Sequence, residues 1–292
     1  MLERERRWAI PVALATFAGL GLLVASILIV RSVAGGGEAE VLRSVEEHRS
    51  DVIAAGVLQA LGLALIAMPL VYLFRAAQAR SERVRGQLIG LVVAAPLFLA
   101  SGALLNSVAT NQAASDFAAG EASADLTAGE ATADCRSERR DDAEGFREDH
   151  GRGEAALRSC AGEAVADDAA ASAVADAPLR GLAIGLGFGG SIGLAFALGY
   201  SALWAMRVGL LTRFWGSLGI ALGVAVLLQL TQFTMFWFLY FALLAAGWLP
   251  GGRPPAWAAG EAIPWPSPGE KAADKLSEAE DEDVADSGEP RA

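Results

Sequence analysis

Long stretches of this chain lack charged residues altogether, although charged side chains make up 20% of the sequence. Hydrophobic residues make up 53%, so charge and apolarity are separated along the chain. Histidine is nearly absent: His48 and His150 are the only two, and they lie in different polar segments. Two such residues are too few to support a histidine metal site or histidine-based general acid–base catalysis.

The common signatures of enzymes are also missing, because the sequence contains no G-x-S-x-G elbow, H-E-x-x-H pair or P-loop. A literal G-x-G-x-x-G occurs at 185–190, but it lies inside the uncharged run 182–206, where no polar helix end can meet a pyrophosphate. The apolar runs hold no Asp, Glu, Lys, Arg or His, which argues against a proton- or sodium-coupled transporter. No basic patch suited to nucleic acid is present. We therefore expect no enzymatic activity, no cofactor and no nucleic-acid partner.

Four uncharged apolar runs have the length of a transmembrane helix. At about 1.5 Å per residue, a helix of 20 residues crosses the hydrocarbon core of about 30 Å. A secretory signal peptide is the alternative for the first run, but its apolar region would be only about 7–15 residues long. We interpret that run as an uncleaved first span. The four runs cover 8–30, 52–74, 87–110 and 182–206.

A fifth apolar region, 214–249, is too long for one span and barely long enough for two. Its 36 uncharged residues would measure about 54 Å as one helix. Thr231 and Gln232 interrupt the middle. A tight helical hairpin there gives six spans, whereas one long helix gives five. We favour six, so the predicted fold class is all-α, an integral membrane bundle of six transmembrane helices.

The distribution of arginine sets the predicted orientation. Short arginine-rich segments at the N-terminus, at 75–85 and at 207–213 are expected to stay on the cytoplasmic side. This places both termini inside, in a bacterial cytoplasmic membrane. The regions are 1–105 with three helices, an acidic extracytoplasmic loop at 106–178, three more helices in 179–249, and a Pro/Trp-rich juxtamembrane segment with an acidic tail at 250–292.

Prolines at the density found in 250–268 exclude a helix and favour an extended, polyproline-like chain. Beyond Lys271 the chain is acidic and poor in apolar residues, so we expect disorder. Tryptophan rings prefer the headgroup level of a membrane. That preference predicts an interfacial position for Trp248, Trp257 and Trp265.

Cys135 and Cys160 are the only cysteines, and both fall in the loop expected to lie outside. An oxidising compartment lets such a pair form a disulfide, and closing this loop would stabilise it by about 3 kcal/mol. A free thiol or a metal site is the rival interpretation. An EF-hand reading of the acidic stretch near 141–150 fails, because its register puts Arg140 and Gly151 where carboxylates are needed. We therefore predict a disulfide and no metal.

Glycine stripes mark the two helices on either side of the 207–213 connector. The first stripe is Gly181, Gly185 and Gly189, and the second is Gly216, Gly219 and Gly223. Residues four apart share one face of a helix, and in lipid such small residues let two helix backbones approach closely. We therefore expect these stripes to lie in the packed centre of the bundle.

A few neutral polar residues lie within or beside the apolar regions. Their simplest role is hydrogen bonding between helices. If they face a cavity instead, they would line a path for a small neutral solute. They are Gln59, Asn106, Gln229, Thr231 and Gln232.

Two stretches of the sequence resemble a group of bacterial multi-pass membrane proteins of unknown function. The first is AMRVGLLTRFWGSLGIALG at 205–223, and the second combines GRPPAW at 252–257 with GEAIPWP at 260–266. The resemblance implies an integral membrane helical bundle with six spans. It implies no activity, ligand or catalytic residue, and the acidic insert before the fourth span is longer than expected for the group.

The leading functional hypothesis is a non-enzymatic membrane protein that acts through helix packing and protein contacts, as a scaffold, accessory subunit or envelope component. Its expected partners are the lipid bilayer and another membrane protein. The first alternative is a facilitator or channel for a small neutral solute. The second is a sensor whose acidic outer loop binds cations.

Overall fold

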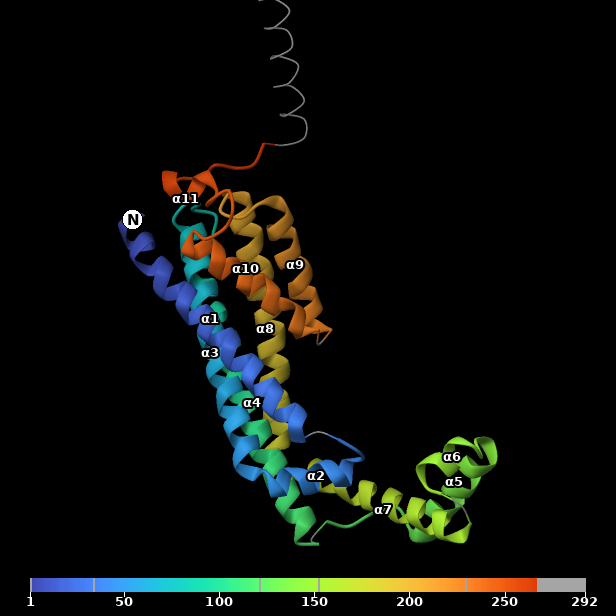
Figure 1. Ribbon diagram of the computed structural model, residues 1–292. Coiled ribbons are helices and arrows are strands. Elements are labelled where there is room, and N and C mark those ends of the chain that lie inside the picture. The colour runs from blue at the N-terminus through green and yellow to red at the C-terminus, as the bar shows by residue number, and fades with distance from the viewer. Residues whose placement is uncertain (1, 34, 121, 152, 229, 267–292) are drawn as a thin grey trace, which may run out of the picture.

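The protein is all-helical in the computed structural model, which describes residues 2–33, 35–120, 122–151, 153–228 and 230–266 and has no β-strand among them. Four of its helices are long and apolar enough to cross a membrane. They run side by side in an elongated bundle (Figure 1). These helices are α1 (Leu2–Val33), α3 (Arg49–Gln78), α4 (Ile89–Ala118), which follows the 3-10 turn η1 (Gly86–Leu88), and α8 (Arg180–Arg207).

The fifth apolar region forms two shorter helices, α9 (Arg213–Leu227) and α10 (Thr234–Ala246), with the 3-10 turn η2 (Thr231–Phe233) between them. The chain therefore breaks where the polar residues interrupt the apolar run. At 15 and 13 residues, the two helices are about 22 and 20 Å long, less than the thickness of a hydrocarbon core. α9 lies along one part of α8, whereas α10 packs mainly against α1 (Figure 1).

The remaining helices lie at the two ends of the bundle (Figure 1). One end carries α2 (Glu38–Glu47) and the connection from α4 to α8, which forms α5 (Ala128–Asp141), α6 (Gly145–Asp149) and α7 (Glu154–Asp176). Because α4 continues to Ala118, this connection begins later than the predicted loop boundary at residue 106. The other end carries the N-terminus and α11 (Pro255–Ala259).

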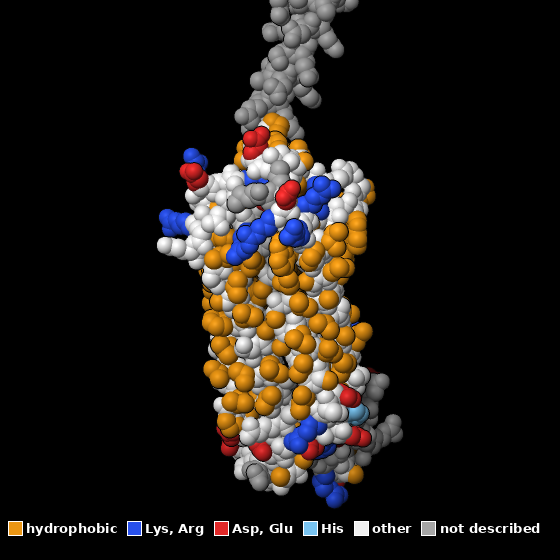
Figure 2. All heavy atoms as spheres, turned by 90° about the vertical axis from the view of Figure 1, so that its left-hand side faces the viewer, with side chains coloured by type: hydrophobic (Ala, Val, Ile, Leu, Met, Phe, Trp, Pro, Cys, Tyr) orange, Lys and Arg blue, Asp and Glu red, His pale blue; other side chains and the backbone are white. Residues whose placement is uncertain are grey.

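The surface of the bundle matches a membrane protein. Hydrophobic side chains cover the middle of the face seen in Figure 2, and charged side chains gather at its two ends. Large apolar side chains such as Leu28, Phe188, Phe196 and Phe236 are 62–68% exposed. Such exposure would be unfavourable in water, whereas lipid solvates these groups.

The glycine stripe predicted on α8 faces away from the neighbouring helices, which corrects the sequence interpretation. Gly181, Gly185 and Gly189 are exposed, and a Cβ added at any of them would meet nothing within 4 Å. Two packed glycines on this helix are Gly190, where a Cβ would lie 2.7 Å from the Leu99 amide nitrogen of α4, and Gly193, where it would lie 2.7 Å from the Ala95 Cβ. The four-residue spacing correctly places the stripe on one face, but it does not say which face meets a neighbour.

Other glycines make the close helix contacts of the bundle. A Cβ at Gly62 of α3 would lie 2.8 Å from the Gly19 carbonyl oxygen of α1. At Gly102 of α4 it would lie 2.8 Å from the Gly187 amide nitrogen of α8. These contacts let neighbouring backbones touch, as small residues do in membrane bundles.

The second glycine stripe is confirmed as packing surface, because all three of its residues are buried between α9 and its neighbours. A Cβ at Gly219 would lie 2.6 Å from the Ala202 Cβ, and one at Gly223 would lie 2.7 Å from the Ala195 carbonyl oxygen. A Cβ at Gly216 would likewise lie too close to the Met206 side chain.

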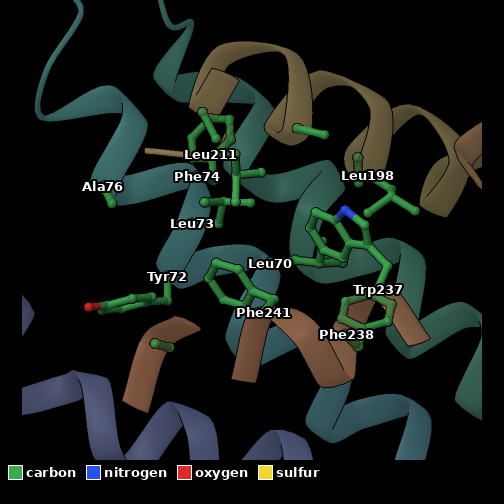
Figure 3. Close-up of a cluster of buried hydrophobic side chains, with 14 of the residues drawn as sticks. Leu70, Tyr72, Leu73, Phe74, Ala76, Leu198, Leu211, Trp237, Phe238 and Phe241 are labelled. Carbon is green, nitrogen blue, oxygen red and sulfur yellow. The ribbon is translucent and has the colours of Figure 1, made fainter. Parts of the chain in front are cut away.

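Aromatic side chains of α10 pack against α3 (Figure 3). Trp237, Phe238 and Phe241 are each no more than 1% exposed, and Figure 3 shows them grouped with Leu70 and other apolar side chains. The Trp237 indole nitrogen donates to the Trp215 carbonyl at 3.0 Å, which satisfies the one polar atom of the ring.

Candidate functional site at the arginine-rich end

The proline-rich segment after α10 folds back onto the bundle and forms the short helix α11, where the sequence predicted none. Pro254 is the N-cap of this helix and Pro255 its first residue. The first helical position tolerates proline, because its missing amide would have no partner within the helix. Trp257 is only 6% exposed, so its ring packs against the protein and has little surface left to contact lipid headgroups.

Arg80, near the end of α3, is the buried charge of this site. Its side chain has no exposed surface, and its two terminal nitrogens donate to the Glu5 carboxylate at 2.9 and 2.8 Å. Its Nε donates to the Ala256 carbonyl at 3.0 Å, and Nη1 also donates to the Ala76 carbonyl at 2.8 Å. These bonds use four of the five N–H donors, and pairing with a carboxylate makes a buried guanidinium tolerable. Arg80 thus joins the start of α1, the end of α3 and α11.

Tyr72 and Trp257 extend this network. Their rings stack with centroids 5.6 Å apart, and the Arg80 guanidinium lies 5.6 Å from the Trp257 ring centre. The Tyr72 hydroxyl donates to the Glu5 backbone carbonyl at 3.1 Å. The Trp257 indole donates to the Leu210 carbonyl at 2.9 Å, in the turn that joins α8 to α9.

The chain beyond α11 continues along the same turn. The Trp265 indole donates to the Leu211 carbonyl at 2.8 Å, and the Ile263 amide donates to the Val208 carbonyl at 3.2 Å. Arg213 donates to the carbonyls of Trp265 and Pro266 at 3.1 and 2.7 Å.

We refer to residues 253–266, packed on the 208–213 turn and on Arg80, as the C-terminal clasp. Arg253 is the first residue of the clasp, and its side chain donates hydrogen bonds to the Leu244 and Ala245 carbonyls of α10. The two stretches that carry the family resemblance, although about 50 residues apart, are the two halves of this one structure. The sequence analysis did not predict the clasp. No pattern near Arg80 or Glu5 in the sequence indicates that their side chains pair in the interior. A usable signal was the repeated tryptophan beside proline.

Exposed arginines surround the clasp, and we name them the arginine collar. Figure 2 shows the cationic side chains gathered at this end of the visible face. Among the residues that the structure describes, none of them has a carboxylate oxygen within 4 Å, whereas Arg80 does. The collar comprises Arg4, Arg6, Arg7, Arg75, Arg83, Arg85, Arg207 and Arg213.

At the opposite end, Cys135 of α5 and Cys160 of α7 form the expected disulfide, with Cα atoms 6.1 Å apart. Both are buried in a small core with Phe146 and Leu157. Glu138 lies close enough to the two sulfurs to suggest a metal site on distance alone. The disulfide takes up both sulfurs, however, and metals bind the thiolate.

Two aspartates of α7 organise this end, and the sequence did not single them out from its many acidic residues. Asp167 accepts a hydrogen bond from the Ala39 amide in the first turn of α2, at 2.8 Å. Asp168 accepts from the Leu126 amide at 2.8 Å. A carboxylate beside the first turn of a helix satisfies an otherwise unpaired amide and interacts favourably with the helix dipole.

The polar residues considered for a cavity do not turn inward where they are described. Gln59 of α3, Asn106 of α4 and Gln232 of η2 are exposed on the outside of the chain. Gln229 lies outside the described residues, and the side chain of Thr231 is likewise not described.

Comparison with protein-family models, curated proteins and solved structures gives no match for this chain. The resemblance of the two clasp stretches to a membrane-protein group therefore stays a prediction.

Proposed function

We propose that this protein is a non-enzymatic membrane scaffold or accessory subunit. The supporting observation is the location of its polar contacts. Apolar side chains and close glycine contacts fill the interior of the bundle. The two structures held together by polar contacts or a disulfide lie at its two ends. One is the disulfide-linked helical module, and the other is the C-terminal clasp with its collar. This arrangement suits a protein that presents two surfaces on opposite sides of a membrane.

The proposed topology has four full spans and one hairpin that enters and leaves on the same side. The six-span prediction counts α9 and α10 as crossings, but each falls about 8–10 Å short of a core of about 30 Å. The turn between them also suits burial in lipid. Leu228 and Leu230 are exposed there, and their amides donate to carbonyls of α9.

The arginine-rich end is proposed to be cytoplasmic, in a bacterial cytoplasmic membrane. Short loops rich in arginine remain on that side during insertion. The N-terminus, the α3–α4 connection, the α8–α9 turn and the clasp all contribute to this end. Both models of the hairpin leave the C-terminus on the same side as the N-terminus.

Cysteine accessibility separates the two topologies. The native cysteines are paired, so a Gln232→Cys variant carries one reactive thiol. We expect a membrane-impermeant maleimide to leave it unlabelled from either side of the membrane, and to label it after solubilisation in detergent. Glu82→Cys and Ser137→Cys are exposed controls at the two ends. Labelling of Gln232→Cys from the side that labels Ser137→Cys would establish six spans instead.

The scaffold proposal is tested by crosslinking in native membranes followed by purification. Wild-type protein should retain a partner at defined stoichiometry, and a Trp257→Ala variant should lose a partner bound at the clasp end. Phe236→Ala, at a lipid-facing position 68% exposed, is the matched aromatic control. Turnover of a substrate by the purified protein alone would refute the proposal. We do not advance the solute-channel or cation-sensor hypotheses, because no described contact favours either one.

A further inference from the structure

We infer that the arginine collar is the docking surface for this chain's own acidic tail, residues 267–292. This inference concerns occupancy of the collar and does not depend on the scaffold proposal. The collar contributes eight exposed guanidinium groups at one end of the molecule. The exposed carboxylates described at that end are Glu3, Glu82 and Glu261, so the surface carries a clear excess of positive charge.

The tail carries the complementary charge. Residues 267–292 contain nine acidic and three basic side chains. Five of the acidic side chains fall within the six residues 278–283. Opposite potentials attract, and arginine binds carboxylates with paired hydrogen bonds.

The clasp determines where the tail begins. Arg213 belongs to the collar and holds the carbonyls of Trp265 and Pro266, the last described residues. Residue 283 lies 17 positions beyond Pro266, so it can reach about 25 Å at the rise of a helix and more than 50 Å when extended. The acidic cluster can therefore reach the collar in either geometry.

Tethering favours the tail over free competitors. Because its origin is fixed at the collar, binding is intramolecular, and the length of the tether sets the effective concentration. Anionic lipid headgroups are attracted to the same arginines, but no covalent link holds them there. The tail would thereby shield the collar from anionic partners when ionic strength is low.

Spin-label distances in the full chain test this inference. The labels go on Ser81→Cys beside the collar and Ser287→Cys in the tail, in nanodiscs of zwitterionic lipid. We expect a short, narrow distance population at about 0.01 M salt. It should disappear at about 1 M salt, where the screening length falls from about 30 Å to about 3 Å. Arg83→Gln with Arg85→Gln should weaken it, because two of the eight collar charges are lost, and since both side chains are exposed we expect the fold to be retained.

Two further samples make the outcome decisive. Neutralising Glu280, Asp281, Glu282 and Asp283 together should abolish the short distance, whereas Arg136→Gln with Arg140→Gln, exposed at the other end, should leave it unchanged. Nanodiscs that contain an anionic phospholipid should retain it at equal ionic strength. If the distance between the labels changes neither with salt nor in the collar variants, the inference is wrong. Complete release by anionic lipid would overturn it too, and would assign the collar to the membrane surface.

Discussion

Arg80 illustrates how one charged residue can join three segments at the edge of an apolar bundle. Its side chain is fully buried and that of Glu5 is 16% exposed. Replacing Arg80 with Met leaves the Glu5 carboxylate mostly buried without its partner, so we expect a loss of about 3 kcal/mol. Thermal or chemical unfolding in detergent measures this loss. Arg83→Met, at an exposed collar position, should change stability by less than about 0.5 kcal/mol, and equal effects would contradict the role of the pair.

Glu130 makes a pH-dependent contribution at the start of α5. Hydrogen bonds from the Thr127 side chain and then from the Thr127 backbone lower the pKa of Glu130 below its ordinary value of 4.5. A lowered pKa means that the carboxylate supports the helix at pH above 4.5 and loses that support as pH falls through the lowered value.

In the wild type, we therefore expect the hydrogen-exchange protection of residues 127–131, corrected for intrinsic rates, to decrease when the pH is lowered below about 4.5. A Glu130→Gln variant should show a flatter profile. Identical profiles in the two proteins would mean that the capping box with Thr127 does not act in solution.

At the scale of the helix, the two glycine stripes predict opposite responses to the same substitution. Gly219→Leu should destabilise the protein by about 3 kcal/mol or more, because even a Cβ there would overlap Ala202 and crowd Trp237. Gly185→Leu should be neutral or stabilising by up to about 1 kcal/mol, because its face is open and leucine favours helix. Thermal stability in detergent distinguishes them, and a loss in Gly185→Leu would show that its face is covered in solution.

The apolar helices could be predicted from sequence, because long uncharged runs leave few other structures possible in a membrane. The break near Gln232 was also foreseeable from the length of the run and its polar residues. The inward face of α8 was not, since its apolar residues continue around the whole helix and provide no contrast. The clasp was not predicted, because the conformational preferences of proline describe a segment that makes no tertiary contacts. Here Arg80, which is distant in sequence, contacts the Ala256 carbonyl and the Trp257 ring of α11.

For the whole molecule, the structure has separate apolar cores in the bundle and in the disulfide-linked module. Removing the disulfide with Cys135→Ser and Cys160→Ser should destabilise the module by about 3 kcal/mol. The bundle should keep its own unfolding transition, because its core contains neither cysteine. Limited proteolysis should then cut within 122–165 while α1, α3, α4 and α8 stay intact. Loss of both transitions together would show that the two cores unfold as one unit.

The clasp also imposes an order on biosynthesis. Arg80 donates to the Ala256 carbonyl, which lies 176 residues further along the chain. At about 5–20 residues per second, a ribosome reaches that acceptor roughly 9–35 s after it has made Arg80. During this interval the guanidinium has only Glu5 and Ala76 from its final set of hydrogen-bond partners. The clasp can therefore close on Arg80 only after residues 81–256 have been translated.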